Sequence, residues 1–158
     1  MSEQQSVPRT FVLDTSVAVK WYLPEELHEE AIRLARRAQT GDVELLAPGT
    51  LRPEFFNALW QQHRRNNLPL QEVRSAWEQF ALDPVALYVP EDLMPRAVEI
   101  TFETGVIVYD ALFLALAEDA DTLVVTADGK LLKALEGTTH ARLAYPLADL
   151  DSLVPDVR

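Results

Sequence analysis

Short apolar runs alternate with longer amphipathic stretches along most of the chain. Apolar runs bounded by polar or turn residues predict buried strands, here at residues 10–13, 43–47, 85–89, 122–126 and, as a final edge strand, 142–145. Apolar residues at helical spacing predict helices at 15–22, 25–40, from Pro53 toward Asn66, from Pro69 through Phe80, and at 95–103, 109–118 and 131–135. Helices that alternate with short strands predict an α/β domain whose parallel sheet is covered on both faces.

Composition narrows the class of protein. The chain has 158 residues, of which 48% are apolar and 25% charged, so we expect a single domain over 1–158 with its core at about 10–146. The absence of cysteine excludes disulfides, thiolate nucleophiles and Cys-ligated zinc. The opening residues 1–10 are too polar for a signal peptide. The longest apolar stretch, 106–117, is too short to span a bilayer. We therefore expect a cytoplasmic protein without a membrane partner.

The acidic balance of the chain bears on its partners. A net charge of −11 and a pI of about 4.6 disfavour a broad basic surface for nucleic acid. They suit a protein that concentrates carboxylates around hard cations, or one that binds a basic partner. Any RNA would have to be bound through local basic patches and metal ions.

Four acidic residues lie at the ends of expected elements, where ligands bind in open α/β sheets. Asp14 follows the first strand, Asp128 follows the strand 122–126, and Asp110 and Glu54 begin helices. Each has an ordinary explanation: an aspartate can cap a helix or form a turn, and a glutamate in a first helical turn complements the helix dipole.

The combination favours a shared metal site. A helix cap needs only a short polar side chain, yet all three expected caps are aspartates. Two carboxylates about 4 Å apart repel each other by roughly 1 to 4 kcal/mol, which a divalent cation such as Mg²⁺ or Mn²⁺ would relieve. Neighbouring polar side chains could support such a site or serve only as local caps; they are Thr15, Ser16, Asn57 and Thr126.

Four segments together resemble the PIN domain and, more narrowly, VapC-type toxins of toxin–antitoxin pairs. They are VLDTSVAVKWYLPEE (12–26), PEFFNAL (53–59), VYDALFLALAE (108–118) and TADGKLLKAL (126–135). The resemblance runs from about 11 to 145. It implies an α/β/α sandwich, a metal site formed by Asp14, Glu54, Asp110 and Asp128, Mg²⁺- or Mn²⁺-dependent cleavage of RNA, a homodimer, and an antitoxin that plugs the active site. The Gly129-Lys130 pair after the last acid departs mildly from the pattern.

Basic and aromatic residues add predictions about RNA and self-association. Arg52 and Lys130 lie close in sequence to Glu54 and Asp128, so either could contact an RNA phosphate. Most of the large apolar residues near the first helices should be core, although some could form a dimer patch; they are Trp21, Tyr22, Leu23, Trp60 and Trp77.

Other functions remain open from the residues alone. A catalytically inactive PIN-like scaffold is the main alternative, although all four acids are retained. A phosphatase of the haloacid dehalogenase type needs an acid two residues after Asp14, where Ser16 stands. No glycine-rich nucleotide-binding motif occurs, and the three histidines are too scattered for a zinc hydrolase.

Overall fold

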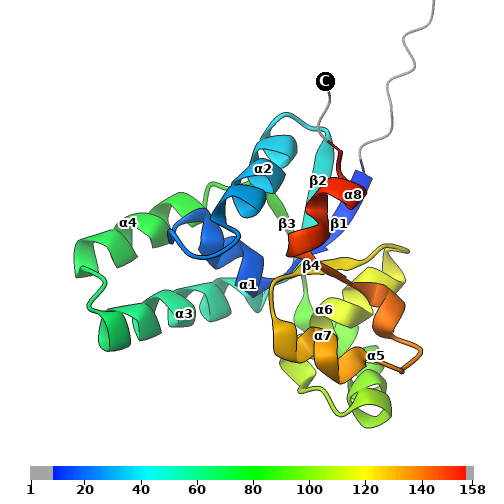
Figure 1. The fold of residues 1–158 in the computed structure, drawn as a ribbon. Helices are drawn as coiled ribbons and strands as arrows, with labels where there is room; N and C mark the ends of the chain where they lie inside the picture. Colours follow the sequence, from blue (N-terminus) through cyan, green and yellow to red (C-terminus); the bar gives the residue numbers. More distant parts are fainter. Residues whose placement is uncertain (1–8, 156–158) are drawn as a thin grey trace, which may run out of the picture.

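Five parallel strands form the centre of the molecule (Figure 1), which is a computed structural model describing residues 9–155. The strands are β1 (Arg9–Leu13), β2 (Val43–Pro48), β3 (Val85–Tyr88), β4 (Val124–Thr126) and β5 (Ala144–Pro146). Their order across the sheet is β3-β2-β1-β4-β5, and every neighbouring pair is parallel. The expected parallel sheet is thus confirmed, and β5 lies at one of its two edges.

Helices cover both faces of this sheet. They are α1 (Thr15–Ala18), α2 (His28–Gln39), α3 (Leu51–Asn66), α4 (Leu70–Phe80), α5 (Pro90–Thr104), α6 (Val108–Asp119), α7 (Gly129–Leu135) and α8 (Leu150–Leu153). Helix α2 packs on β2 from one side, while α6 packs on β1, β2 and β4 from the other, with α5 and α7 beside it (Figure 1). The three-layer α/β/α arrangement agrees with the sequence prediction.

The central position of β1 decides where the site lies. β1 pairs with β2 through Val12 and Leu46, and with β4 through Leu13 and Val125. After β1 the chain adds β2 and β3 on one side of β1, and it then crosses back to add β4 on the other side. The strand order therefore reverses between β1 and β4, which is the switch point of the fold. In open α/β sheets, ligands bind beyond the carboxyl ends of strands at such a point.

The α3–α4 hairpin extends from the body as an arm (Figure 1). At its base, the fully buried Phe55 stacks on Phe80 with ring centroids 3.9 Å apart, and Tyr22 meets Phe55 edge-on at 5.6 Å. These contacts anchor the first turns of α3 to the helical segment that follows β1. They therefore also fix the position of Glu54, the residue before Phe55.

Several expected boundaries were wrong for local reasons. The helix expected from Glu25 begins only at His28, because Leu27 adopts a left-handed backbone conformation with a φ of 64°. The helix expected from Pro95 begins at Pro90, a residue well suited to the first helical position. The helix expected over 15–22 divides into α1 and a short 3₁₀ helix, Val19–Trp21.

The apolar residues considered for a dimer patch are mostly core. Trp21 and Leu23 are buried and Tyr22 is partly buried, whereas Trp60 on α3 keeps 40% of its surface exposed. Among residues 9–155, no single helix has the length and apolarity of a membrane span; α5 and α6 would qualify only as a pair bent by 113°.

Candidate functional site

Asp14 and Asp128 lie where the carboxyl ends of β1 and β4 meet. Asp14 directly follows β1 and caps α1 by accepting a hydrogen bond from the backbone N–H of Ser16. Asp128 follows β4 and caps α7 by accepting from the N–H groups of Lys130 and Leu131 at 2.9 and 3.3 Å. The capping role considered for both residues is therefore confirmed, and it leaves each carboxylate fixed at the sheet edge.

A network of hydroxyl groups ties Asp14 to the β4 side. Thr126, fully buried, donates from Oγ1 to Oδ2 of Asp14 at 3.0 Å and accepts from the N–H of Asp128 at 3.0 Å. The Ser16 hydroxyl also donates to Oδ2 of Asp14, and it accepts from the N–H of Ala127 at 2.9 Å. These two hydroxyls thus position the acids that follow β1 and β4.

Glu54 and Asp110 approach the site from two helices. Glu54 lies in the first turn of α3 and accepts a hydrogen bond from Oγ1 of Thr15 at 3.2 Å. Asp110 lies in the first turn of α6, just before a run of buried residues from Ala111 to Ala117. The capping role considered for Asp110 was wrong, because the helix begins two residues earlier and its N-cap is Ile107.

The four acids influence one another electrostatically. Burial raises the pKa of Asp14, and the charge of Asp128 raises it further. Burial, with the charges of Asp14 and Asp110, raises the pKa of Glu54 to about 7 against the hydrogen bond from Thr15. Burial also raises the pKa of Asp110 to about 6, again with contributions from Asp14 and Asp128. Repulsion that links all four residues indicates one acidic cluster.

The donor atoms suit a hard divalent cation. In residues 9–155 the hydrogen bonds to Asp14 all reach Oδ2, the one to Glu54 reaches Oε2, and those to Asp128 reach Oδ1. One oxygen of each of these three acids, and both of Asp110, carry no hydrogen bond within that part of the chain. Mg²⁺ and Mn²⁺ prefer carboxylate oxygens.

The cluster is not already arranged as a finished metal site. Within the described part of the chain, no three His, Asp or Glu side chains are grouped closely enough to hold an ion. Since unneutralised carboxylates repel each other, binding an ion would require these side chains to turn toward a common point. The oxygens without hydrogen bonds are the ones that could do so.

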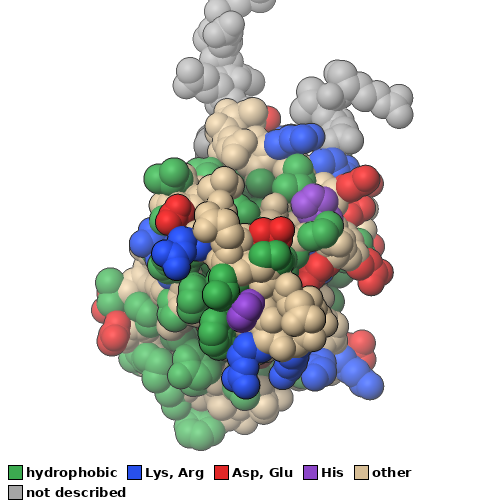
Figure 2. Space-filling model, turned by 90° about the vertical axis from the view of Figure 1, so that its left-hand side faces the viewer, with side chains coloured by type: hydrophobic (Ala, Val, Ile, Leu, Met, Phe, Trp, Pro, Cys, Tyr) green, Lys and Arg blue, Asp and Glu red, His purple; other side chains and the backbone are tan. Residues whose placement is uncertain are grey.

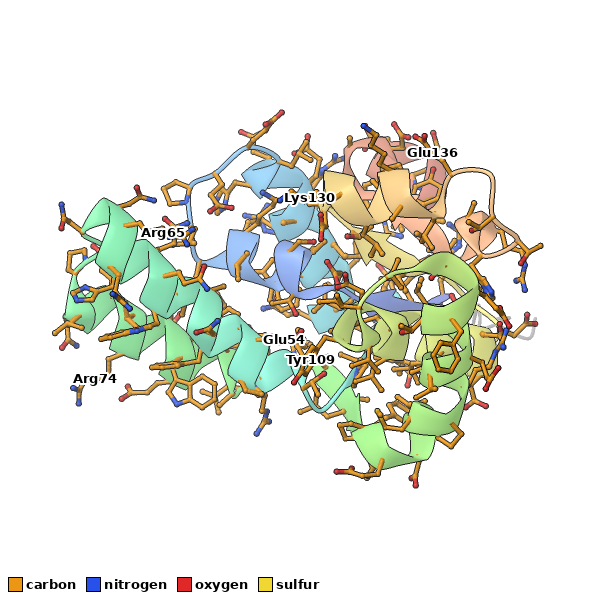
Figure 3. The ribbon with its side chains drawn as sticks, turned by 90° about the horizontal axis from the view of Figure 1, so that it is seen from below. Glu54, Arg65, Arg74, Tyr109, Lys130 and Glu136 are labelled. Carbon is orange, nitrogen blue, oxygen red and sulfur yellow. The ribbon has the colours of Figure 1, made fainter. Side chains whose placement is uncertain are left out.

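The remaining predicted residues fall into two groups. Thr15, Ser16 and Thr126 hold the acids through hydrogen bonds. Asn57 is exposed on α3, one turn beyond Glu54. Lys130 is exposed at the start of α7, and Figure 3 shows it across from the arm.

Arg52 is less well placed than its sequence position suggested. It is exposed on α3 two residues before Glu54. Side chains two residues apart leave a helix about 200° from each other, so Arg52 points away from the cluster. Farther along α3, Arg65 points within about 20° of the direction of Glu54, and its neighbour Arg64 within about 80°. The sequence shows these two arginines as a basic pair near the end of the helix expected from Pro53 toward Asn66, and the helical spacing from Glu54 relates them to the cluster.

Comparisons with known proteins show the family and the fold of the chain. The PIN domain family matches residues 11–136. Ribonuclease VapC3 of Pyrobaculum aerophilum is 33% identical over 124 residues, which cover 76% of this chain and 90% of that protein. A toxin–antitoxin complex from Klebsiella pneumoniae contains a chain with a TM-score of 0.59, 17% identity, and coverage of 87% of this chain and 97% of that one. A crystal structure of a Pyrobaculum aerophilum protein has a TM-score of 0.61, 17% identity, and coverage of 92% and 98%. At this identity the two structures support the fold alone.

Proposed function

Since the chain belongs to the PIN domain family and, within it, to the VapC-type ribonucleases, we propose that it is a metal-dependent endoribonuclease and the toxin of a type II toxin–antitoxin pair. The observation that carries the proposal is the acidic cluster at the β1–β4 switch point. The charges of neighbouring acids, Asp128 among them, help to raise the pKa values of Asp14, Glu54 and Asp110, and within residues 9–155 each of the four acids has at least one oxygen without a hydrogen bond. Such a cluster is costly unless a cation neutralises it.

The residues of this chain would divide the work. Asp14, Glu54, Asp110 and Asp128 would hold Mg²⁺ or Mn²⁺, which when bound lowers the pKa of water and neutralises charge on the scissile phosphate. Ser16 and Thr126 orient the Asp14 carboxylate, and Thr15 orients Glu54. The raised pKa of Glu54, about 7, lets this carboxyl exchange a proton near neutral pH before an ion is bound.

Partners follow from the same proposal. The Klebsiella pneumoniae neighbour was solved as a toxin–antitoxin complex, which supports a cognate antitoxin protein as a partner of this chain. A net charge of −11 suits an antitoxin with a basic segment. RNA would be the substrate, the cytoplasm the site of action, and a homodimer the working form.

RNA cleavage tests the proposal. We would incubate total cellular RNA with purified protein freed of any partner, in Mg²⁺, Mn²⁺ or EDTA, and compare the wild type with Asp110→Asn. Asp110 accepts no hydrogen bond in residues 9–155, so this substitution should remove charge without disturbing the fold. Asp119→Asn, at the exposed far end of the same helix, is the matched control.

The outcomes separate the nuclease from a scaffold. Discrete cleavage that requires the metal and is lost in Asp110→Asn but kept in Asp119→Asn supports the proposal. Cleavage that persists in EDTA would contradict the metal-dependent mechanism. Absence of both cleavage and metal binding in the wild type would favour an inactive PIN-like binding module.

A further inference from the structure

We propose that one face of α3 binds the RNA strand that leaves the acidic cluster. This face, called the α3 stripe, consists of Asn57, Trp60, Gln61, Arg64 and Arg65. The inference rests on the proposed nuclease function and adds to it a path for the substrate. It assigns phosphate binding to Arg64 and Arg65 and base stacking to Trp60.

Helical geometry aligns most of the α3 stripe with Glu54. Residues three, four or seven positions apart lie on the same face of a helix, and from Glu54 this spacing leads through Asn57 and Gln61 to Arg64 and Arg65. All four residues beyond Glu54 are exposed. Arg65 lies three turns along α3, about 16 Å from Glu54 at a rise of about 1.5 Å per residue. A single strand covers that distance in a few nucleotides.

A shallow hollow joins the members of the stripe. Its volume is about 410 Å³, and its lining residues are Asn57, Trp60, Gln61, Arg64 and Arg65. The polar side chains can donate hydrogen bonds to phosphate or base oxygens, and the two guanidinium groups match phosphate geometry in particular. In Figure 3, Arg65 lies toward the far end of the arm from Glu54, whereas Arg74 projects from the opposite edge.

The segment between Glu54 and Glu72 differs in charge from the rest of the chain. The protein carries 25 acidic residues, yet none occurs between Glu54 and Glu72. Elsewhere Arg37 and Arg96 pair with carboxylates, whereas within residues 9–155 no ion pair involves Arg64 or Arg65. Figure 2 views the molecule from the side on which the arm extends, and it shows Lys and Arg side chains gathered along the lower part of this face. An otherwise acidic protein thus keeps cations available beside its candidate active site.

Trp60 gives the stripe a surface for a base. Its side chain is 40% exposed, and its ring lies 5.3 Å from that of His63 at an angle of 31°. Exposed aromatic rings beside cationic side chains are typical of surfaces that bind single-stranded nucleic acid, since unpaired bases stack on them. Exposed aromatic and cationic groups around one hollow favour RNA over an acidic protein segment.

Salt-dependent RNA binding tests the inference. The probe is a fluorescein-labelled single-stranded oligouridylate, and its anisotropy is measured against KCl concentration with the Asp110→Asn protein in Mg²⁺. Each phosphate contact on a single strand contributes about 0.7 to the slope of log affinity against log salt. Arg64→Gln/Arg65→Gln should therefore weaken binding and reduce this slope by about 1.4. Arg36→Gln/Arg74→Gln removes the same charge from exposed positions off the stripe and should leave the slope unchanged.

Trp60 should show a different signature. Trp60→Ala should weaken binding by about tenfold at every salt concentration and leave the slope intact, because it removes stacking and no charge. Trp60→Phe should restore part of the affinity. Equal losses with Ala and Phe, or a changed slope, would contradict the stacking role.

Two results would overturn the inference while leaving the nuclease proposal in place. One is an RNA-binding slope for Arg64→Gln/Arg65→Gln equal to that of the charge-matched control. The other is loss of antitoxin binding by this variant with RNA binding unchanged, which would make the stripe a protein-binding surface. In a protein with Asp110 intact, Arg64→Gln/Arg65→Gln should also raise the KM for RNA cleavage and leave kcat nearly unchanged. If the wild type itself cleaves no RNA, that result contradicts the nuclease proposal on which the inference rests.

Discussion

Replacing Glu54 by glutamine should stabilise the metal-free protein at pH 8 and have little effect at pH 4.5. In the folded protein the pKa of Glu54 is raised from 4.5 to about 7, first by burial and then by the charges of Asp14 and Asp110. A carboxyl whose folded pKa is raised favours folding while protonated. That contribution is complete below pH 4.5 and is lost as the pH rises through 7. Glutamine stays neutral at every pH in this range, so the variant does not lose this contribution to folding stability.

The size of the effect follows from the pKa difference. A pKa difference of one unit corresponds to about 1.36 kcal/mol. The rise of the Glu54 pKa from 4.5 to about 7 therefore limits the gain in folding stability to about 3 kcal/mol. Glu54 retains contact with solvent, which screens its interactions, so we expect about 1 to 2 kcal/mol at pH 8. For a protein of this size, each kcal/mol corresponds to about 2 to 4 °C in melting temperature.

Thermal unfolding in EDTA, followed by circular dichroism at pH 4.5 and pH 8, measures the difference. Glutamine can still accept the hydrogen bond from Thr15, so the comparison isolates the charge. Glu99→Gln, at an exposed position in the middle of α5, is the control and should shift both melting temperatures equally. A Glu54→Gln protein that melts at or below the wild-type temperature at pH 8 would refute the reasoning about mutual repulsion.

Three further substitutions distinguish residues that stabilise the fold from a residue proposed to act in RNA cleavage. Thr126→Val removes a buried donor to Asp14 and leaves the Asp128 N–H unpaired, so urea unfolding should show a loss of about 1 to 3 kcal/mol; a neutral result would contradict the network. Asp128→Asn should keep the α7 cap and its melting temperature but abolish RNA cleavage, whereas Asp128→Ala should also lose about 1 kcal/mol; retained cleavage in either would remove Asp128 from the site. Phe55→Ala should cost about 3 to 5 kcal/mol in urea unfolding, because it leaves a cavity against Phe80; a loss below 1 kcal/mol would mean that the base of the arm repacks.

The sequence predicted the fold where apolar periodicity was strong. β1 and β2 were expected within one residue of their observed ends, and α6 within one residue at each end. The errors fell where local backbone conformation decides the boundary. Leu27 in a left-handed conformation delays α2, and a 3₁₀ helix over Ala141–Leu143 moves the start of the last strand two residues along the chain. Side-chain patterns carry little information about such turns.

The sequence pointed to the four proposed site acids but not to their contacts. Strand ends and helix starts singled out these acids as candidates, because such positions meet at one edge of a parallel sheet. The sequence did not show that Thr15 would reach Glu54 on α3 or that Ser16 would contact the N–H of Ala127. These contacts join segments far apart in the chain, and they depend on how α1 packs against α3 and β4.

Titration of the partner-free protein with Mn²⁺ by isothermal calorimetry tests the central claim most directly. The comparison is between the wild type and four variants that each remove one charge: Asp14→Asn, Glu54→Gln, Asp110→Asn and Asp128→Asn. If the four acids form one metal site, the wild type binds Mn²⁺ and every variant binds it more weakly. Wild-type affinity in all four variants, or no binding by the wild type, would contradict the account.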